Sequence, residues 1–278
     1  MGSLALALFA LLPLRVSFIA VGQGDAALVR SPTGKTVLVD GGPAEAERSL
    51  ERVVRAQLAR GPLDLVLLSH RHADHLGGLE RLITSLGALG AREFLDAGFA
   101  HESPAWTSLK HLLDARHVPV RTAELGRRIE LGDGALLELL GPPSPPIGRS
   151  RSNVNANSIV ARLDWKHASV LFTGDAEAAT ERWLLRSGAR LRARVLKVAH
   201  HGSNLSSTPR FLRAVRPEAA IISVGLLNEY RHPHPATLQR LRAIGAAIYR
   251  TDEDGTITLD SDGEQLAFTR AHPLKASR

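Results

Sequence analysis

Apolar and polar positions follow two patterns along the chain. Short β-branched runs at 15–21, 25–31 and 35–40 predict strands, and the turns between them contain the glycine or proline that tight hairpins need. Apolar positions at helical spacing over 44–60 predict an amphipathic helix, and 64–69 is typical of a strand buried on both faces. The sequence therefore predicts a layered α/β fold that begins with antiparallel strands.

The alternation of strands and helices continues beyond this point. A helix is expected over LGGLERLITSL, a strand and helix pair over roughly 92–121, and two short strands near 128–140. The proline- and asparagine-rich stretch 141–157 predicts a loop between two halves. The second half is expected to contain, in order, strands SIVARLD and ASVLFTGD, a helix from 176, strand RVLKVA, helix 208–216, strand AAIISVG, helix 236–246 and a final pair of strands.

The first 14 residues form an apolar segment of their own. The run LALALFALLPL is shorter than the roughly 18 residues that a membrane-spanning helix needs. No basic residue precedes it and no clear cleavage site follows, so a complete signal peptide is not expected. We interpret residues 1–14 as the end of a truncated membrane helix; the alternative is an ordinary buried first segment.

Composition narrows the chemistry. The chain has no cysteine, which excludes disulfides, thiolate metal sites and a cysteine nucleophile. A formal net charge of +7 favours a polyanionic partner such as nucleic acid, although arginine abundance also follows from genome composition. Aromatic residues make up 4% of the chain, so an extended base-stacking platform is not expected and binding should be directed at the backbone.

A cluster of metal-binding side chains follows the buried strand 64–69. His70, His72, Asp74 and His75 offer three imidazoles and a carboxylate within six residues, at the strand end where α/β folds place their sites. On an extended segment His70 and His72 point to the same side. The turn that follows would direct Asp74 and His75 towards a second ion, so the pattern suits two metals, and one or two divalent ions are expected.

The remaining ligands should come from other strand ends. Asp40 ends TVLVD, and Asp175 ends VLFTGD, where it could bridge two ions or cap the next helix. His200 and His201 follow the strand VLKVA, and we expect one of them to be a ligand.

These motifs resemble those of a known family. HRHADH matches the H-x-H-x-D-H signature of the metallo-β-lactamase superfamily, and VGQGDA, NSIVARL, LFTGDAE, LKVAHHGSNLSS and ISVGLLNEYRHPHP are together similar to the C-terminal domain of ComEC/Rec2 DNA-uptake (competence) channels. The resemblance implies an αββα sandwich over 15–278, with metals at one edge of two sheets. It also implies a metal-dependent phosphodiesterase, a nuclease that degrades the DNA strand that is not imported.

The resemblance also implies a ligand set. His70 and His72 would bind metal one, Asp74 and His75 metal two, and Asp175 both. His200 or His201 would complete metal two, and Asp40 would orient a ligand imidazole or the bridging hydroxide. Asp74, Asp175 and His234 are thus the expected catalytic residues of the site.

One position departs from the family pattern. The superfamily usually supplies a third histidine to metal one from the segment that here reads Asn153 to Ser158, so Asn155 is expected as a weak ligand. An amide oxygen is a harder ligand than imidazole, which favours Mn²⁺, with Zn²⁺ or Mg²⁺ as alternatives. No small organic cofactor is expected.

The substrate phosphate is expected to contact Lys197, His232 and His234, with His234 as a proton donor; the alternative for both histidines is a polar loop before a helix. Other cations lie in sequence beside the site loops and could follow a phosphate backbone. They are Arg71, Arg149, Arg151, Arg210 and Arg231.

The expected partners are single-stranded DNA and a membrane channel domain of the same parent protein, on the extracytoplasmic face of a bacterial membrane. Two other functions stay open. One is a phosphorylcholine or teichoic-acid phosphodiesterase, against which the absence of aromatic repeats argues. The other is a metal-stabilised module that guides DNA without cutting it.

Overall fold

The computed structural model describes residues 12–58, 61–87 and 90–271. The predicted membrane-helix end therefore lies outside the described residues over 1–11. Of the described part, Leu14 already belongs to the first strand. Among the helices described, none is long and apolar enough to cross a membrane.

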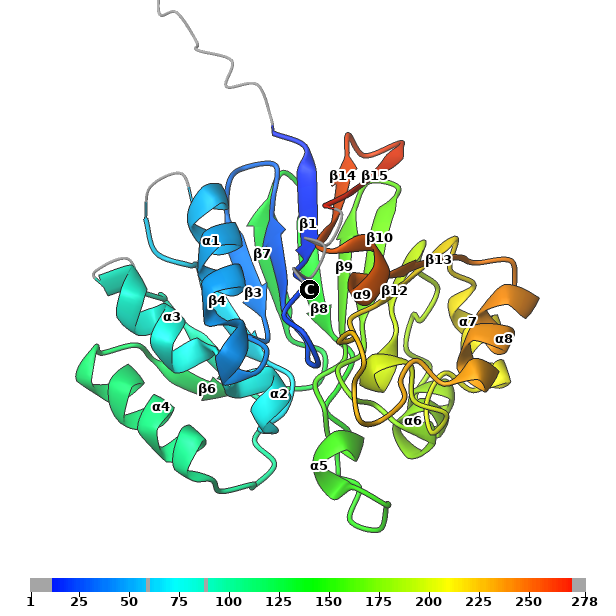
Figure 1. Cartoon of the computed structure of the whole chain (residues 1–278), viewed down its shortest axis with the longest axis horizontal. Helices are drawn as coiled ribbons and strands as arrows, with labels where there is room; N and C mark the ends of the chain where they lie inside the picture. The colour runs from blue at the N-terminus through cyan, green and yellow to red at the C-terminus, as the bar shows by residue number, and fades with distance from the viewer. Residues whose placement is uncertain (1–11, 59–60, 88–89, 272–278) are drawn as a thin grey trace, which may run out of the picture.

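Two mixed β-sheets form the inner layers of the fold (Figure 1). Within the described residues the first sheet has eight strands in the order β15-β14-β1-β2-β3-β4-β5-β6. Strands β15 to β3 pair antiparallel and β3 to β6 pair parallel. The bounds are β1 (Leu14–Phe18), β2 (Ala27–Arg30), β3 (Thr36–Val39), β4 (Leu65–Leu68), β5 (Phe94–Asp96), β6 (Val120–Thr122), β14 (Ile257–Ser261) and β15 (Leu266–Arg270).

The second sheet, counted over the same part of the chain, has seven strands in the order β13-β12-β11-β10-β9-β8-β7. Strands β7 to β10 pair antiparallel, and β10 to β13 pair parallel. Their bounds are β7 (Arg128–Gly132), β8 (Ala135–Leu139), β9 (Ala161–Trp165), β10 (Ala168–Phe172), β11 (Val195–Lys197), β12 (Ala219–Ile222) and β13 (Ala247–Arg250).

Helices cover the outer faces of both sheets. In Figure 1, α1, α3 and α4 lie outside the first sheet, and α6, α7 and α8 lie outside the second. This arrangement confirms the predicted αββα sandwich. The helices are η1 (Ala44–Ala46), α1 (Glu47–Gln57), α2 (Ala73–Leu76), α3 (Leu79–Leu86), α4 (Pro104–Ala115), α5 (Asn153–Ala156), α6 (Ala178–Arg186), η3 (Ala199–Gly202), α7 (Pro209–Val215), α8 (Pro235–Ala243) and α9 (Thr251–Asp254).

Three hydrophobic cores explain why the central strands are apolar at every position. Val37 and Val39 of β3 pack into the core between the sheets, while Leu38 packs against helices α1 and α3. The same division holds in the second sheet, where Val170 faces the first sheet and Leu171 faces the helices. Successive side chains of a strand point to opposite faces, so a strand buried on both faces cannot alternate with polar residues.

The sequence missed several short elements, among them α2, β6 and η3. The loop predicted over 141–157 contains the helical turn α5, which the hydroxyl of Ser152 caps by accepting from the Asn155 N–H at 3.3 Å. Strand β13 and the turn α9 were not predicted either. Because β13 is an edge strand with partly exposed positions, it lacks the apolar run that marked the other parallel strands.

The contact between the sheets generates a prediction about stability. Phe18 of β1 and Phe172 of β10 meet across the inter-sheet core, with ring centroids 6.2 Å apart. We expect Phe18→Ala to lower the free energy of unfolding by about 3–5 kcal/mol, because the cavity would be enclosed on all sides. Urea unfolding measures this loss. Phe268→Ala on the edge strand β15, where the ring is partly exposed, is the control and should cost clearly less; equal losses would contradict the assignment of the core.

Candidate metal centre

The ligand-type side chains predicted from the sequence converge at one edge of the two sheets. Strands β3 and β4 are parallel neighbours, and so are β10 and β11, so the loops that follow them meet at the carboxyl ends of the strands. Among the described residues, candidate ligand atoms form three groups, each with all atoms within 4.8 Å of one another. Two of the groups share Asp175: His70, His72 and Asp175, and Asp74, His75, Asp175 and His201. The third contains Asp25, Asp40 and His75.

Asp40 anchors the histidine loop from behind. It follows β3, is buried, and accepts from the Ser69 N–H at 2.7 Å and from the Ser69 hydroxyl at 2.8 Å. Its other contact is with Nδ1 of His75 at 2.9 Å. A carboxylate on one ring nitrogen fixes the tautomer and aims the other nitrogen, Nε2, at the cluster. The contact places Asp40 against an imidazole of the histidine loop, as the expected orienting role requires.

Asp175 lies between the two groups of ligands. Its Oδ1 is 3.3 Å from Nε2 of His75, and its Oδ2 is 3.8 Å from Nε2 of His70. The turn before it packs closely on the histidine loop, since a Cβ added to Gly174 would lie 2.9 Å from Cβ of Ser69. Gly174 also has a φ of +46°, a conformation that favours glycine. The TGD motif therefore places a carboxylate among the imidazoles because its glycine permits the approach.

The structure distinguishes between the two adjacent histidines that the sequence left open. His201 is buried, and its Nε2 lies 3.1 Å from Oδ2 of Asp74, while its Nδ1 is 3.0 Å from the carbonyl oxygen of Ser223. His200 is partly exposed. Its Nε2 lies 3.7 Å from Oδ2 of Asp175, about as close as Nε2 of His201 lies to Oδ1 of Asp175 (3.8 Å), but His200 belongs to none of the groups of candidate ligand atoms. Only His201 is thus grouped with Asp74 and Asp175.

Both histidines have left-handed backbone conformations, with a φ of 51° each. Such values are unusual for residues with a Cβ and cost free energy that the surrounding contacts must offset. The His200 N–H donates to the carbonyl of Gly174 at 3.1 Å, which ties the strained turn to the loop that presents Asp175. The strain therefore lies where two ligand loops are joined.

The site concentrates negative charge away from water. Burial lowers the pKa of His75, but Asp175 and Asp74 outweigh it and raise that pKa well above its usual value. Burial likewise lowers the pKa of His201, and Asp175 and Asp25 outweigh it and raise the pKa to about 10. Burial raises the pKa of Asp175, yet His75 and His201 hold it well below its usual value. The carboxylates therefore require positive charge at this place.

A divalent metal fits these residues. Nε2 of His75 and Oδ1 of Asp175 are buried without a hydrogen-bond partner, although both point into the cluster. Leaving such atoms unsatisfied is costly, and metal coordination would satisfy them. The donor set of imidazoles and carboxylates, without sulfur, suits Zn²⁺, Mn²⁺ or another first-row ion.

Asn155 lies at the edge of the same site. Its side-chain oxygen is buried without a hydrogen-bond partner, and its Nδ2 lies 3.5 Å from Glu177. Glu177 is also 3.5 Å from Nδ1 of His200. The amide oxygen is thus available to a ligand, next to a carboxylate that the sequence analysis did not single out.

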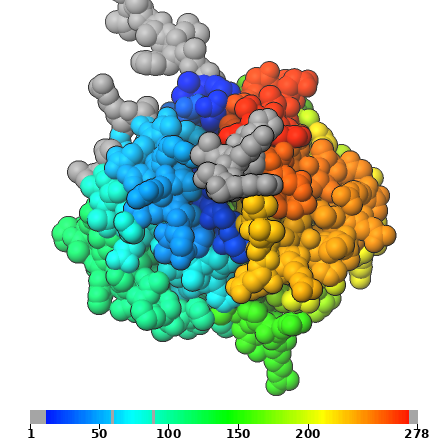
Figure 2. All heavy atoms as spheres, viewed as in Figure 1, coloured from blue at the N-terminus to red at the C-terminus, as the bar shows by residue number. Residues whose placement is uncertain are grey.

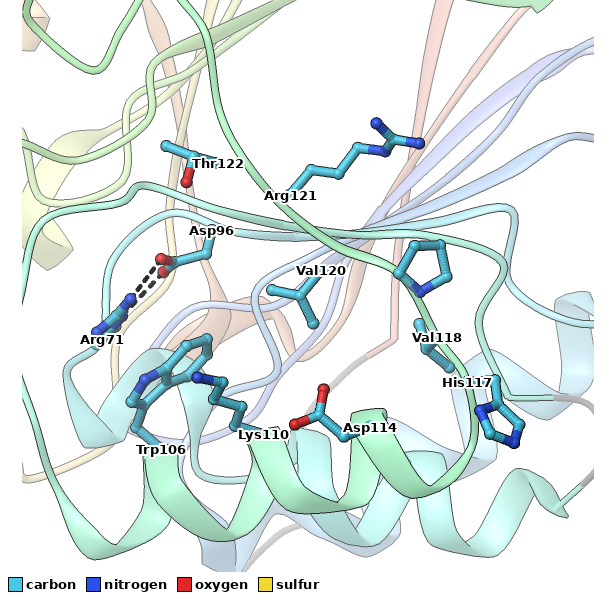
Figure 3. Close-up of a pocket in the computed structure, with 11 residues that line it drawn as sticks. Arg71, Asp96, Trp106, Lys110, Asp114, His117, Val118, Val120, Arg121 and Thr122 are labelled. Carbon is cyan, nitrogen blue, oxygen red and sulfur yellow. Dashed lines mark hydrogen bonds and ion pairs between the residues drawn. The ribbon is translucent and has the colours of Figure 1, made fainter.

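Two cations expected to contact substrate have partners inside the protein. Lys197 is 3% exposed, and its ammonium donates to Oδ2 of Asp25 at 2.7 Å. Arg71 pairs with both carboxylate oxygens of Asp96 (Figure 3). Its guanidinium also lies 4.0 Å from the ring centroid of Trp106, beside a cavity of about 530 Å³. Both cations are therefore paired with carboxylates of the protein itself.

The two histidines of the segment HPHP, His232 and His234, lie in different surroundings. His232 lies beside the cluster, with its ring centroid 5.7 Å from that of His200. Burial and the neighbouring His201 lower the pKa of His232 to about 4. His234 is exposed and caps α8, where its Nδ1 accepts from the Ala236 N–H at 3.1 Å. The remaining predicted cations, Arg149, Arg151, Arg210 and Arg231, are exposed.

Asp25 belongs to the motif VGQGDA, and the sequence alone assigns it no role. It is buried between Lys197 and His201, with Oδ1 3.2 Å from Nδ1 of His201. Burial raises its pKa, but Lys197 and then His201 outweigh this and lower the pKa to about 2. An Asp after a tight turn is usually a turn residue, so the sequence signal was weak. The role of Asp25 depends on residues more than 170 positions away.

The buried ion pair of Asp25 and Lys197 generates a prediction about stability. Lys197→Met should lower the free energy of unfolding by about 3–5 kcal/mol, because it leaves Asp25 buried without its cation. Adding Asp25→Asn should restore part of the loss. Arg194→Met, which removes a more exposed pair with Glu218, should cost less than about 1 kcal/mol. Urea denaturation of the metal-loaded protein compares the variants, and a Lys197→Met variant as stable as Arg194→Met would refute the assignment.

The two adjacent histidines generate a second prediction. His201→Gln should remove the ion held with Asp74 and His75, while His200→Gln should retain the metal content of the unaltered protein. Elemental analysis after gel filtration measures metal per chain, and circular dichroism verifies that both variants are folded. Loss of metal in His200→Gln but not in His201→Gln would reverse the assignment.

Comparison with known proteins agrees with this geometry. The profile of the metallo-beta-lactamase superfamily matches residues 19–225. Competence protein ComA of Neisseria gonorrhoeae is 32% identical over 85% of the chain, and ComE operon protein 3 of Bacillus subtilis is 28% identical over 87%. Recombination protein 2 of Haemophilus influenzae is 28% identical over 92%. The chain spans 30–32% of the length of these bacterial relatives.

Solved structures share the fold at low sequence identity. The metallo-beta-lactamase fold protein YhfI of Bacillus subtilis superposes with a TM-score of 0.55 at 15% identity, covering 86% of this chain and 96% of its own. Zn²⁺-bound PqqB of Methylobacterium extorquens has a TM-score of 0.55 at 12% identity, covering 88% and 99%. With the sequence match over 19–225 and the paired His and Asp clusters, the chain belongs to the metallo-β-lactamase superfamily.

Proposed function

We propose that this domain is a metal-dependent phosphodiesterase that hydrolyses DNA, with a preference for single strands. The observation that carries the proposal is the pair of ligand groups that share Asp175 at the edge of the sheets. If both groups held an ion with Asp175 as a shared ligand, the pair of ions would suit an in-line displacement at phosphorus. The resemblance to competence proteins supports DNA over other phosphodiesters, and degradation of the strand that is not imported is the corresponding role.

The residues of the two ligand groups and Asp40 would have separate roles in the reaction. His70, His72 and Asp175 would hold one ion, and Asp74, His75 and His201 would hold the other with Asp175. When bound, divalent ions supply Lewis-acid activation of water and neutralise charge on phosphate oxygens. Asp40 keeps His75 in one tautomer through its Nδ1 contact of 2.9 Å. These residues hold charge in place before the substrate arrives, so little reorganisation is needed during reaction.

His232 is the histidine best placed to contact a substrate phosphate. Its pKa of about 4 keeps the ring neutral at pH 7, so one ring nitrogen is a hydrogen-bond donor and the other an acceptor. Its Nδ1 is buried without a partner. His234 would have to give up its cap on α8 to take part, so we assign the phosphate contact to His232.

Asn155 would influence which metal ion the site prefers. Its amide oxygen would complete the coordination of the ion held by His70 and His72, in the place of an imidazole. A harder oxygen ligand lowers the advantage of Zn²⁺ relative to Mn²⁺ or Mg²⁺, and we therefore propose Mn²⁺ as the best activator.

The setting is proposed from the relatives. Because the chain spans less than a third of their length, we propose that the domain is linked to a membrane channel of the same parent protein. The extracytoplasmic face of a bacterial membrane is the corresponding location.

The proposed activity predicts cleavage of labelled single-stranded oligonucleotides in Mn²⁺. Cleavage should fall with Mg²⁺ or Zn²⁺, stop with EDTA, and be lost in Asp175→Asn, which removes the shared ligand. Raising the salt concentration should weaken DNA binding, because each neutralised phosphate releases counterions. Gel electrophoresis of time courses measures the rates, with duplex DNA compared in parallel.

Two results would replace the proposal. Rapid hydrolysis of a phosphorylcholine ester with no cutting of any oligonucleotide would identify a small-ester phosphodiesterase. Salt-sensitive DNA binding without cleavage under any metal would identify a module that guides DNA.

A further inference from the structure

Exposed apolar side chains gather in one loop beside the metal centre. The loop joins β12 to α8 and covers residues 225–232, which we call the rim loop. Five large hydrophobic side chains are exposed among the described residues, and three belong to this loop: Leu226 at 67%, Leu227 at 95% and Tyr230 at 61%. Apolar groups exposed together beside a site mark a contact surface.

Hydrogen bonds hold the rim loop in a defined shape. The amide of Asn228 donates to the carbonyls of Gly225 at 2.9 Å and His232 at 2.7 Å, and its oxygen accepts from the His232 N–H at 2.9 Å. The Gly225 N–H donates to Oε1 of Gln23 at 3.1 Å, which ties the loop to the turn after β1. On the face shown in Figure 2, the gold segment that contains the loop borders the dark-blue N-terminal segment.

The backbone of the loop is also strained. Leu227 has a φ of 53° and Arg231 a φ of 55°, and both are residues that rarely adopt left-handed conformations. The loop therefore has an unfavourable backbone conformation and still leaves Leu227 and Tyr230 exposed to solvent. Strain that persists at the border of a site indicates a function for the side chains it presents.

A series of rings connects the rim loop to the metal ligands. Tyr230 stacks on His232, with centroids 5.9 Å apart and an interplanar angle of 27°. His232 meets His200 edge to face at 5.7 Å, and Nε2 of His200 is 3.7 Å from Oδ2 of Asp175. Since Tyr230 is mostly exposed, the ring face away from His232 is accessible to a ligand that also reaches the metal centre.

We propose that Tyr230 is a stacking platform for one unpaired base next to the phosphate at the metal centre, so that the site binds single-stranded nucleic acid through a base as well as through its backbone. This inference rests on the proposed phosphodiesterase function. A duplex keeps its bases stacked inside, whereas an unpaired base can leave its neighbours and pack on an aromatic ring.

Charge does not explain the rim loop as well as stacking does. Glu229 and Arg231 flank Tyr230 in the sequence and cancel in charge. The loop therefore contributes little attraction for a phosphate backbone. What distinguishes it is a planar ring held in place, which contacts bases of any sequence.

The test compares two strands of equal charge. Metal-loaded protein in Mn²⁺ is titrated into fluorescein-labelled oligonucleotides about twelve nucleotides long, within the usual site size of single-strand binders. One is oligothymidylate and the other carries abasic sites throughout, both with phosphorothioate linkages that resist hydrolysis. Fluorescence anisotropy gives the dissociation constants.

We expect oligothymidylate to bind about 5- to 150-fold more tightly than the abasic strand, as stacking of one base predicts. Tyr230→Ala should abolish this ratio while leaving abasic binding unchanged, and Tyr230→Phe should preserve it. Tyr249→Ala is the matched control, because the chain has two tyrosines and Tyr249 stacks on Phe268 in β15 instead. It should retain the ratio of the unaltered protein.

Equal affinity of the unaltered protein for both strands would overturn the proposal, and so would a Tyr230→Ala variant that keeps the ratio. The failure of the proposed function gives a different result. If only the proposed phosphodiesterase function is wrong, the ratio of the affinities for oligothymidylate and the abasic strand still depends on Tyr230, but no phosphodiester is hydrolysed with any metal.

Discussion

The structure depends on the burial of negative charge where the two sheets meet. Asp25, Asp40 and Asp175 are each less than 5% exposed, and Asp74 lies beside them. Carboxylates can be held in such a place only if cations compensate them. The chain supplies Lys197 and two imidazoles with raised pKa values, and a divalent ion would supply the rest.

This requirement links the two halves of the protein. Parallel strands in each sheet end at the same edge, so the loops that bear ligands are brought together by topology. Asp25 and Lys197 then join the first half to the second across 172 positions. The left-handed turn at His200 and His201 is stabilised through its contact with Gly174. Stability and site geometry therefore rest on the same residues.

Membership of a superfamily does not by itself define a substrate, because one fold supports many reactions. The ligands of the metal centre describe the chemistry that is available, and the rim of the site describes what can reach it. Here the amide of Asn155 reaches the site through Glu177, and the ring of Tyr230 reaches it through His232. Both features belong to this chain's own loops, and substrate selection is best sought there.

The sequence determined most of the fold, and it singled out the ligand-type side chains that the structure brings together. Runs such as TVLV and LVLL are apolar at every position, which indicates strands buried on both faces, and the ligand types at strand ends indicate a shared edge. The edge strand β13 was missed because an exposed edge does not require an apolar run. A local pattern of apolar residues indicates that a segment is buried. Most of the elements that were predicted are buried in this way.

Tertiary structure decided the partners of each side chain. The sequence could not choose between His200 and His201, and it placed Lys197 and His234 at the substrate. In the fold, His201 contacts Ser223 and Asp74, while Lys197 pairs with Asp25 and His234 caps α8. These outcomes depend on contacts between residues far apart in the chain and on backbone angles, neither of which a local pattern contains.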